Sequence, residues 1–290
     1  MLFTTLLCLA LADAKPAYAK PAMLVEPAEL TKPDASRRFV ILDVRPRKAY
    51  TAGHIPGAVW ADLAGWDRLV TADAGPEGWP SRLGELGIDG KKPVVVYGDS
   101  KSRDAARAWW ILRQQGVPDV RLVNGDWAGY KKAGGPIEEN SKENLGRVKV
   151  VLTPAKDRLT TKAEILAGLK GGKLAQIIDA RTTGEYCGDT KSAKRGGSIP
   201  GAKHLDWADT IDPKTGRFKP AGEMKKLFED AGIALDEPTA TYCQSGGRAA
   251  VMAFVFELMT DKPAKNYYRS WAEWGNDPDT PIATPKAKKD

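Results

Sequence analysis

The feature that most constrains the fold of this chain is an internal repeat. Segments 41–45 and 177–181 are both apolar runs that end in Asp-x-Arg, and each is followed by an Ile-Pro-Gly-Ala turn, at 55–58 and 199–202. The same order of motifs at two places indicates two copies of one structural unit. Short β runs alternate with helical patterns in both copies. We therefore predict an α/β fold, in which each copy is a mostly parallel sheet flanked by helices.

One loop of the second copy carries residues suited to covalent chemistry. A β-like run, 239–242, leads into Cys243, and a helical pattern of apolar residues follows Arg248. Two glycines allow the N–H groups of the loop to turn inward, and Arg248 adds positive charge, so the thiolate is favoured over the thiol. A thiolate is the nucleophilic form, as covalent catalysis requires. In the first copy the aligned loop, 98–103, has Gly98 at the cysteine position, so that copy cannot form a covalent intermediate there.

The loop, with four residues between Cys243 and Arg248, resembles the active loop of the rhodanese family of sulfurtransferases. The duplicated motifs extend this resemblance over about 23–281, and an inactive first copy beside an active second copy is similar to two-domain thiosulfate and 3-mercaptopyruvate sulfurtransferases. The resemblance implies two tandem rhodanese-like domains and donor binding by Arg181 and Arg248. It also implies a persulfide on Cys243, cradled by Gln244, Ser245, Gly246 and Gly247.

The sequence leaves two sulfur donors open. Thiosulfate is a dianion that suits the charge of Arg248, whereas 3-mercaptopyruvate carries one carboxylate, so thiosulfate is favoured. The loop departs from the mercaptopyruvate pattern at Gln244, Gly247 and Arg248 but keeps Ser245 and Gly246, and 3-mercaptopyruvate is the alternative. We expect a small anionic donor, a thiophilic acceptor such as cyanide or a thiol, and no cofactor. The sequence defines neither the physiological acceptor nor the oligomeric state, and it is compatible with a monomer.

Two other classes of function compete with sulfur transfer. The loop of a cysteine phosphatase or arsenate reductase resembles Cys-x5-Arg, whereas the shorter spacing here makes a smaller ring. A non-catalytic binding or relay module needs no nucleophile, but the loop of the second copy is complete. A cysteine hydrolase needs a histidine base, and His54 and His204 both lie beside Pro-Gly-Ala turns, where a structural role is expected.

The length of 290 residues fits two domains, since a typical domain has roughly 150. A stretch rich in Gly, Pro, Glu, Asn and Lys, 134–147, lacks apolar periodicity and predicts a connection between them. We expect the first copy to form one wall of the active-site cleft, with Trp60 and Asp62 as candidates. The predicted parts are a leader at 1–22, an inactive domain at 23–137, a linker at 138–150 and a catalytic domain at 151–284.

The remaining polar residues argue against metal and nucleic-acid partners. Cys187, Cys243 and the two histidines lack paired ligand spacing, so no metal site is predicted. Cys187 is expected to be an unpaired loop thiol, although a disulfide with Cys243 would switch the enzyme off. The net charge of +7 is too evenly spread for a nucleic-acid tract, and it favours anionic substrates.

The N-terminus predicts export. An apolar run at 2–12 is followed by small-residue cleavage sites at 12–14 and 17–19, which is typical of a secretory signal peptide and a periplasmic product. No Lys or Arg precedes the run, so translation from Met23 and a cytoplasmic product is the alternative. No other stretch approaches the roughly 20 apolar residues of a membrane span, so no membrane contact is expected after leader removal.

Overall fold

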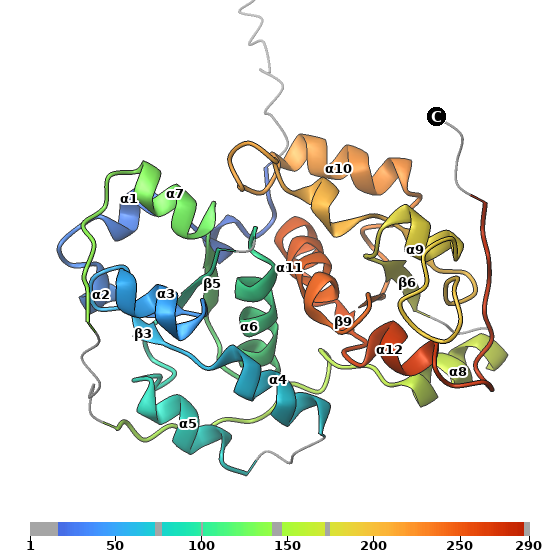
Figure 1. Ribbon diagram of the computed structural model, residues 1–290, viewed down its shortest axis with the longest axis horizontal. Coiled ribbons are helices and arrows are strands. Elements are labelled where there is room, and N and C mark those ends of the chain that lie inside the picture. Colours follow the sequence, from blue (N-terminus) through green and yellow to red (C-terminus); the bar gives the residue numbers. More distant parts are fainter. Residues whose placement is uncertain (1–16, 73–76, 100, 141–146, 172–174, 287–290) are drawn as a thin grey trace, which may run out of the picture.

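The computed structural model describes residues 17–72, 77–99, 101–140, 147–171 and 175–286, which form two α/β domains (Figure 1). The elements of the first domain are η1 (Pro21–Met23), β1 (Leu24–Val25), α1 (Pro27–Leu30), α2 (Ala35–Arg38), β2 (Val40–Asp43), α3 (Arg47–Ala52), β3 (Val59–Trp60), α4 (Leu63–Thr71), α5 (Trp79–Glu85), β4 (Val94–Tyr97), α6 (Arg103–Gln114), β5 (Val120–Val123) and α7 (Asp126–Lys132). Those of the second are α8 (Lys162–Gly171), β6 (Gln176–Asp179), α9 (Thr183–Cys187), β7 (Lys203–His204), η2 (Trp207–Thr210), α10 (Ala221–Asp230), β8 (Thr239–Tyr242), α11 (Gly247–Thr260), β9 (Lys265–Asn266) and α12 (Ser270–Trp274).

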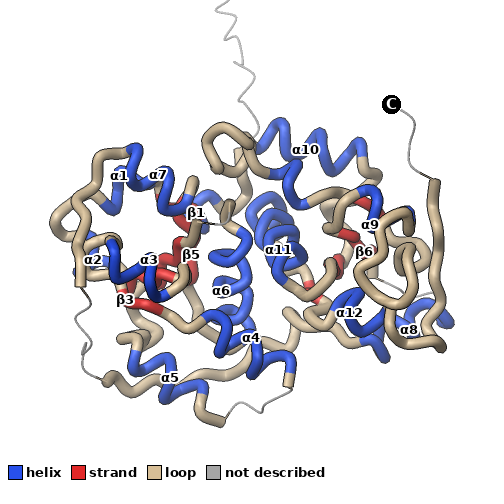
Figure 2. The backbone as a smooth tube through the Cα atoms, in the orientation of Figure 1, coloured by secondary structure: helices blue, strands red, loops and turns tan. Residues whose placement is uncertain are grey.

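Each domain is built on one parallel sheet, and Figure 2 shows the strands enclosed by helices. The strand orders are β1-β5-β4-β2-β3 and β7-β6-β8-β9. Equivalent strands pair in the same register, since Asp43 of β2 lies opposite Tyr97 of β4 and Asp179 of β6 lies opposite Tyr242 of β8. The predicted tandem α/β architecture with mostly parallel sheets is thus confirmed.

The central strands form where the sequence offers short runs that can be buried on both faces. All four residues of β4, Val94–Tyr97, are buried, as are all four of β8, Thr239–Tyr242. Such runs suit the interior of a parallel sheet because helices cover both of its faces. The strand predicted at 239–242 therefore has the predicted bounds, and it ends immediately before Cys243.

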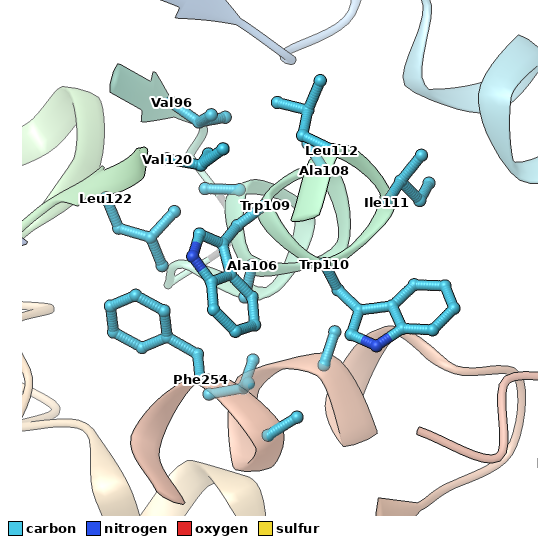
Figure 3. Packing of buried hydrophobic residues seen from close by; sticks show 14 of the residues in the cluster. Val96, Ala106, Ala108, Trp109, Trp110, Ile111, Leu112, Val120, Leu122 and Phe254 are labelled. Atoms are coloured by element: carbon cyan, nitrogen blue, oxygen red, sulfur yellow. The ribbon is translucent and has the colours of Figure 1, made fainter. Parts of the chain in front are cut away.

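The two domains pack together through α6 and α11, which lie side by side in Figure 1, and Figure 3 shows buried side chains of this contact. Trp109 of α6 meets Phe254 of α11 edge to face at 5.1 Å, and Trp110 stacks on Tyr268 at 4.8 Å. Because α11 packs on its own sheet and on α6, it is buried almost all round, as its largely apolar sequence requires. One continuous core cluster contains residues of both domains.

The chain between the domains lies against the first domain. The Val148 N–H donates to the Gly84 carbonyl at 3.1 Å, and the Ala155 N–H donates to the Gln114 carbonyl at 2.8 Å. Further along, the indole N–H of Trp110 donates to the Arg158 carbonyl at 3.1 Å. Part of the predicted linker, 141–146, lies outside the described residues.

The predicted leader is only partly described, because 1–16 lie outside the described residues. The part from 17 onward packs on the second domain. The Tyr18 hydroxyl donates to the Lys219 carbonyl, and the Lys20 N–H donates to the Leu258 carbonyl at 3.1 Å. Within the described part of the chain, every helix falls short of the length and apolarity that crossing a membrane demands.

Candidate active site

The predicted cysteine loop, residues 243–248, follows β8 directly and runs into the first turn of α11. It therefore lies at the carboxyl end of a parallel strand and at a helix N-terminus, where ligands of α/β proteins usually bind. The side chain of Cys243 is buried, and its N–H donates to the Ser270 hydroxyl at 3.1 Å. Ser270 has a φ of 54°, a left-handed conformation that residues other than glycine rarely adopt. Asp126, at the equivalent place of the first domain, has the same φ, so this conformation belongs to the part of the fold that both domains share.

Three carbonyl groups of the cysteine loop are bound from outside the loop. The donors are the N–H groups of Trp271 and Ala272 and the side-chain amide of Asn266, which hold the carbonyls of Cys243, Gln244 and Gly246 at 3.0, 2.9 and 3.1 Å. In a trans peptide the carbonyl and the following N–H point in opposite directions. The N–H groups that follow these three carbonyls are therefore turned toward the inner side of the loop. Successive N–H groups arranged in this way form a cradle for an anion.

Both glycines of the loop are needed where they stand. Gly246 has a φ of 84°, and a Cβ there would lie 2.8 Å from the Tyr268 carbonyl oxygen. A Cβ on Gly247 would lie 2.5 Å from Nη2 of Arg107, which belongs to the first domain. The first glycine is thus required by the turn, and the second by the close approach of the neighbouring domain.

A cleft of about 550 Å³ opens over the cysteine loop where the two domains meet. Its lining residues are Arg103, Asp104, Arg107, Trp207, Cys243, Gln244, Ser245 and Arg248. The structure thus brings together the cysteine and three other predicted loop residues.

The first domain forms one wall of this cleft, as predicted, but with different residues. Arg103 and Arg107, at the start of α6, line it. The earlier candidates have other roles: Trp60 donates its indole N–H to the Arg45 carbonyl at 2.8 Å, and Asp62 caps the N-terminus of α4. Arg103 ends the loop that aligns with the cysteine loop. Had the two equivalent loops been expected to face each other across the domain contact, Arg103 could have been predicted as a cleft residue.

Arg248 lies in the cleft, but its charge is paired. Its Nη1 and Nη2 donate to the two carboxylate oxygens of Glu185 at 2.6 and 2.9 Å. Burial lowers the pKa of Arg248, but its hydrogen bonds to Glu185 and its electrostatic interactions with Cys243 and Glu185 outweigh burial and raise this pKa above its usual value. For the carboxyl group of Glu185 burial acts in the opposite direction and raises the pKa, but the hydrogen bonds and charge of Arg248 lower this pKa to about 2. Glu185 is therefore ionised. It offsets the positive charge of Arg248, which was predicted to bind the sulfur donor.

Gln244 is also engaged by a distant segment. Its side-chain carbonyl accepts from the Ser192 hydroxyl at 2.6 Å, and its amide donates to the Ser192 backbone carbonyl at 2.9 Å. The reciprocal pair fixes the side chain of Gln244 at the rim of the cleft. Sequence reasoning missed Ser192, which lies in an irregular loop with no motif of its own.

Each domain carries the same buried polar cluster at the end of its central strands. The Asp179 carboxylate accepts from Arg181 Nε at 2.9 Å, from Arg181 Nη2 at 2.6 Å and from the Tyr242 hydroxyl. Arg181 also donates to the Gly197 carbonyl at 2.7 Å, and its guanidinium lies 4.4 Å from the Trp271 ring centre. Burial and the charge of Asp179 raise the pKa of Tyr242 well above its ordinary value. The cluster ties β6, β8 and α12 together.

The placement of Arg181 differs from the prediction that it binds the donor. Its side chain is 1% exposed, and it does not line the cleft above Cys243. Arg45 of the first domain pairs with Asp43 at the same distance, 2.6 Å, although Gly98 stands at the cysteine position there. An arginine that recurs where no nucleophile exists serves the strand end rather than the chemistry. This placement favours a structural role for Arg181 at the strand end, and donor binding by Arg181 stays an untested prediction.

Cys187 and Cys243 are both free thiols. Burial raises the pKa of the Cys187 thiol, which leaves it less nucleophilic at neutral pH. Among the described residues, no group of three or more His, Cys, Asp or Glu side chains is placed to hold a metal ion.

Two parallel α/β domains, the second with a buried cysteine between a strand and a helix N-terminus, define the class of protein with which the chain was compared. The family model of the rhodanese-like domain matches the chain twice, at residues 26–133 and 161–277. The chain belongs to the rhodanese family of sulfurtransferases.

Individual relatives agree with this assignment over nearly the full length of the chain. The sulfur carrier protein TtuD of Thermus thermophilus is 34% identical over 281 residues, covering 92% of this chain and 98% of the relative. A thiosulfate sulfurtransferase of Azotobacter vinelandii is 29% identical and covers 91% and 98%. The crystal structure of SseA from Escherichia coli, a 3-mercaptopyruvate sulfotransferase with the rhodanese fold, superposes with a TM-score of 0.74 at 27% identity. The match covers 86% of this chain and 98% of SseA.

Proposed function

We propose that this protein transfers sulfane sulfur from thiosulfate to a thiophilic acceptor through a persulfide on Cys243. The observation that carries the proposal is the outward binding of successive loop carbonyls, which turns the N–H groups of the loop toward the place where an anionic sulfur would sit. A persulfide anion needs such donors because it is buried and cannot be solvated by bulk water. Cys243 is the nucleophile, and Gln244, Ser245, Gly246 and Gly247 cradle the transferred sulfur.

The reaction has two displacement steps. The Cys243 thiolate attacks the outer sulfur of thiosulfate, the S–S bond of the donor breaks, and sulfite leaves with the electron pair. Cys243 then holds one extra sulfur as a persulfide anion. An acceptor such as cyanide attacks that outer sulfur, the new S–S bond breaks, and the Cys243 thiolate is restored. No proton needs to be moved by a histidine base, and neither histidine lines the cleft.

The donor is selected by the charge of the cleft. Arg103 and Arg248 place guanidinium groups on the wall of the cleft, and a dianion gains more from them than a monoanion does. The bidentate pair between Arg248 and Glu185 weakens this preference, and it favours 3-mercaptopyruvate as the second candidate donor. Both donors use the same nucleophile.

We assign the parts of the chain to this function as follows. The domain at 23–137 supports the cleft, 138–150 is the linker, and the domain at 151–284 is catalytic. The leader at 1–22 directs export to the periplasm, with a cytoplasmic product from Met23 as the alternative. The small anionic donor and the thiophilic acceptor are its only proposed partners.

The test is steady-state sulfur transfer to cyanide from thiosulfate and from 3-mercaptopyruvate, measured side by side. Wild type is expected to prefer thiosulfate, and Cys243→Ala is expected to lose activity with both donors, by at least about a thousandfold. Cys187→Ala is the matched control and should remain active. A preference for 3-mercaptopyruvate would reject the donor assignment alone, whereas an active Cys243→Ala protein would reject the mechanism.

A further inference from the structure

The fourth carbonyl of the cysteine loop is held from the other domain. The Ser245 carbonyl accepts a hydrogen bond from Nη2 of Arg107 at 3.1 Å. Its peptide is trans, so the N–H of Gly246 points the opposite way, to the inner side of the loop with its neighbours. We propose that Arg107, in the domain without a cysteine, is the positioning residue that completes the amide cradle around Cys243. This inference rests on the proposed function, since it concerns how the same site is assembled.

Arg107 is itself held in place on two sides. Its Nη1 pairs with the Asp67 carboxylate of α4 at 2.8 Å, and the same carboxylate oxygen accepts from the Tyr268 hydroxyl. The next turn of α6 is fixed by the buried Trp109 and Trp110, which pack against the second domain (Figure 3). The guanidinium therefore reaches the loop from a rigid helix, which suits a positioning group better than a mobile surface side chain would.

The contact is a directed hydrogen bond rather than a simple addition of charge. Asp67 offsets the charge of Arg107 at 2.8 Å, so little net charge reaches the cleft from this pair. The planar guanidinium presents separate donors to Asp67 and to Ser245, which a lysine ammonium on a flexible stem cannot reproduce. Gly247 lacks the Cβ that would lie 2.5 Å from Arg107 Nη2 and block this approach. The loop sequence and the first domain are thus fitted to each other.

Arg103 provides a matched comparison in the same cleft. It lines the cleft from the same helix, but its Nε pairs with the neighbouring Asp104 at 3.1 Å and its side chain is 46% exposed. Removing Arg103 removes a cation near the donor without removing a bond to the loop backbone. Comparison of the two positions therefore separates positioning from charge.

The experiment uses the full-length chain and the variants Arg107→Lys, Arg107→Ala and Arg103→Ala, each checked for thermal unfolding. The first readout is the rate at which iodoacetamide alkylates Cys243 at fixed pH, with no sulfur donor present and with Cys8 and Cys187 replaced by alanine throughout. Both Arg107 variants should slow alkylation and kcat by about 10- to 100-fold and leave KM within about threefold of wild type. Added guanidinium chloride should partly restore Arg107→Ala. Arg103→Ala should raise KM for thiosulfate and leave alkylation within about twofold.

Wild-type alkylation in Arg107→Lys would overturn the proposal, because charge alone would then suffice. Equal effects of Arg107→Ala and Arg103→Ala would overturn it as well. If the Arg107 variants fail to fold, Asp67→Asn removes the anchor charge with little change of shape, and it should slow alkylation in the same direction; no change would contradict the proposal. Because alkylation needs no donor, it tests the cradle even if neither thiosulfate nor 3-mercaptopyruvate proves to be the substrate.

Discussion

The two domains share a frame at the ends of their central strands but differ in what the frame holds. The backbone N–H of Trp127 in the first domain donates to the Gly98 carbonyl at 3.0 Å, and that of Trp271 in the second donates to the Cys243 carbonyl at 3.0 Å. The guanidinium of the Asp-x-Arg motif lies over these tryptophans at 4.2 and 4.4 Å. The fold of the domain therefore does not depend on a cysteine in the loop. Catalytic potential resides in a few side chains placed on a frame that both domains retain.

The most informative difference is the residue that supports the loop. In the second domain the Cys243 N–H donates to the neutral hydroxyl of Ser270. In the first domain Asp126 takes that place, and its carboxylate accepts from the N–H groups of Gly98 and Ser102. Burial raises the pKa of Asp126 to about 6. The amide of Ser102, which could otherwise face a substrate anion, is thus already bound to an internal carboxyl group.

Moving that carboxyl group from one domain to the other tests whether the support residue distinguishes the two loops. Ser270→Asp should lower sulfur transfer by about 100-fold, because a carboxylate beside Cys243 disfavours the thiolate and occupies loop donors. Steady-state transfer to cyanide measures the effect. Asp126→Ser, the reverse change in the first domain, should leave the rate near that of wild type. Full activity of Ser270→Asp would mean that the support residue does not distinguish the domains.

The shared frame can be tested by weakening it in each domain separately. Arg181→Lys and Arg45→Lys each remove a buried bidentate contact, so each should lower the free energy of unfolding by about 3 kcal/mol. Denaturant unfolding of both variants measures this loss. Folded Arg181→Lys should keep its KM for thiosulfate within about twofold. A large rise in KM without loss of stability would restore Arg181 as a donor-binding residue.

A smaller difference is the ion pair between Glu185 and Arg248, which has no counterpart among the described residues of the first domain. Glu185 follows its Asp-x-Arg motif by four residues, and Ala49 occupies the corresponding position of the first domain. The folded-state pKa of Glu185 is about 2, below its ordinary value of 4.5. Its stabilisation is therefore present above pH 4.5 and is lost as the pH falls toward 2, and it amounts to at most about 3 kcal/mol. Urea unfolding across this range should give a flatter acid dependence for Glu185→Gln than for wild type.

Much of this organisation could be predicted from the sequence because it is local. The repeated Asp-x-Arg and Pro-Gly-Ala motifs predicted the two domains, and the strand at 239–242 followed by Cys243 predicted the position of the loop. The contacts that complete the site are long-range. Glu185 lies 63 residues from Arg248, and Arg107 lies 138 residues from Ser245. No spacing rule joins such pairs, since they meet only after both sheets and the contact between α6 and α11 have formed.

The sequence alone could not separate two roles for Arg181. Its motif recurs in both domains, although only one of them has a cysteine at the loop. The buried geometry favours structure, because Arg45 repeats the ion pair and the carbonyl contact of Arg181.

The central claim is that the second domain can hold a persulfide and that the first cannot, even when it is given a thiol. A Cβ on Gly98 would find its nearest neighbours at 3.6 Å, so Gly98→Cys fits the first loop without steric conflict. This variant is treated with thiosulfate, digested and analysed by mass spectrometry for peptides that have gained the mass of one sulfur atom. The account predicts that the added sulfur resides on Cys243 and that the introduced thiol stays unmodified. Comparable sulfur on the introduced thiol would contradict it, because the cysteine alone, rather than the loop around it, would then create the site.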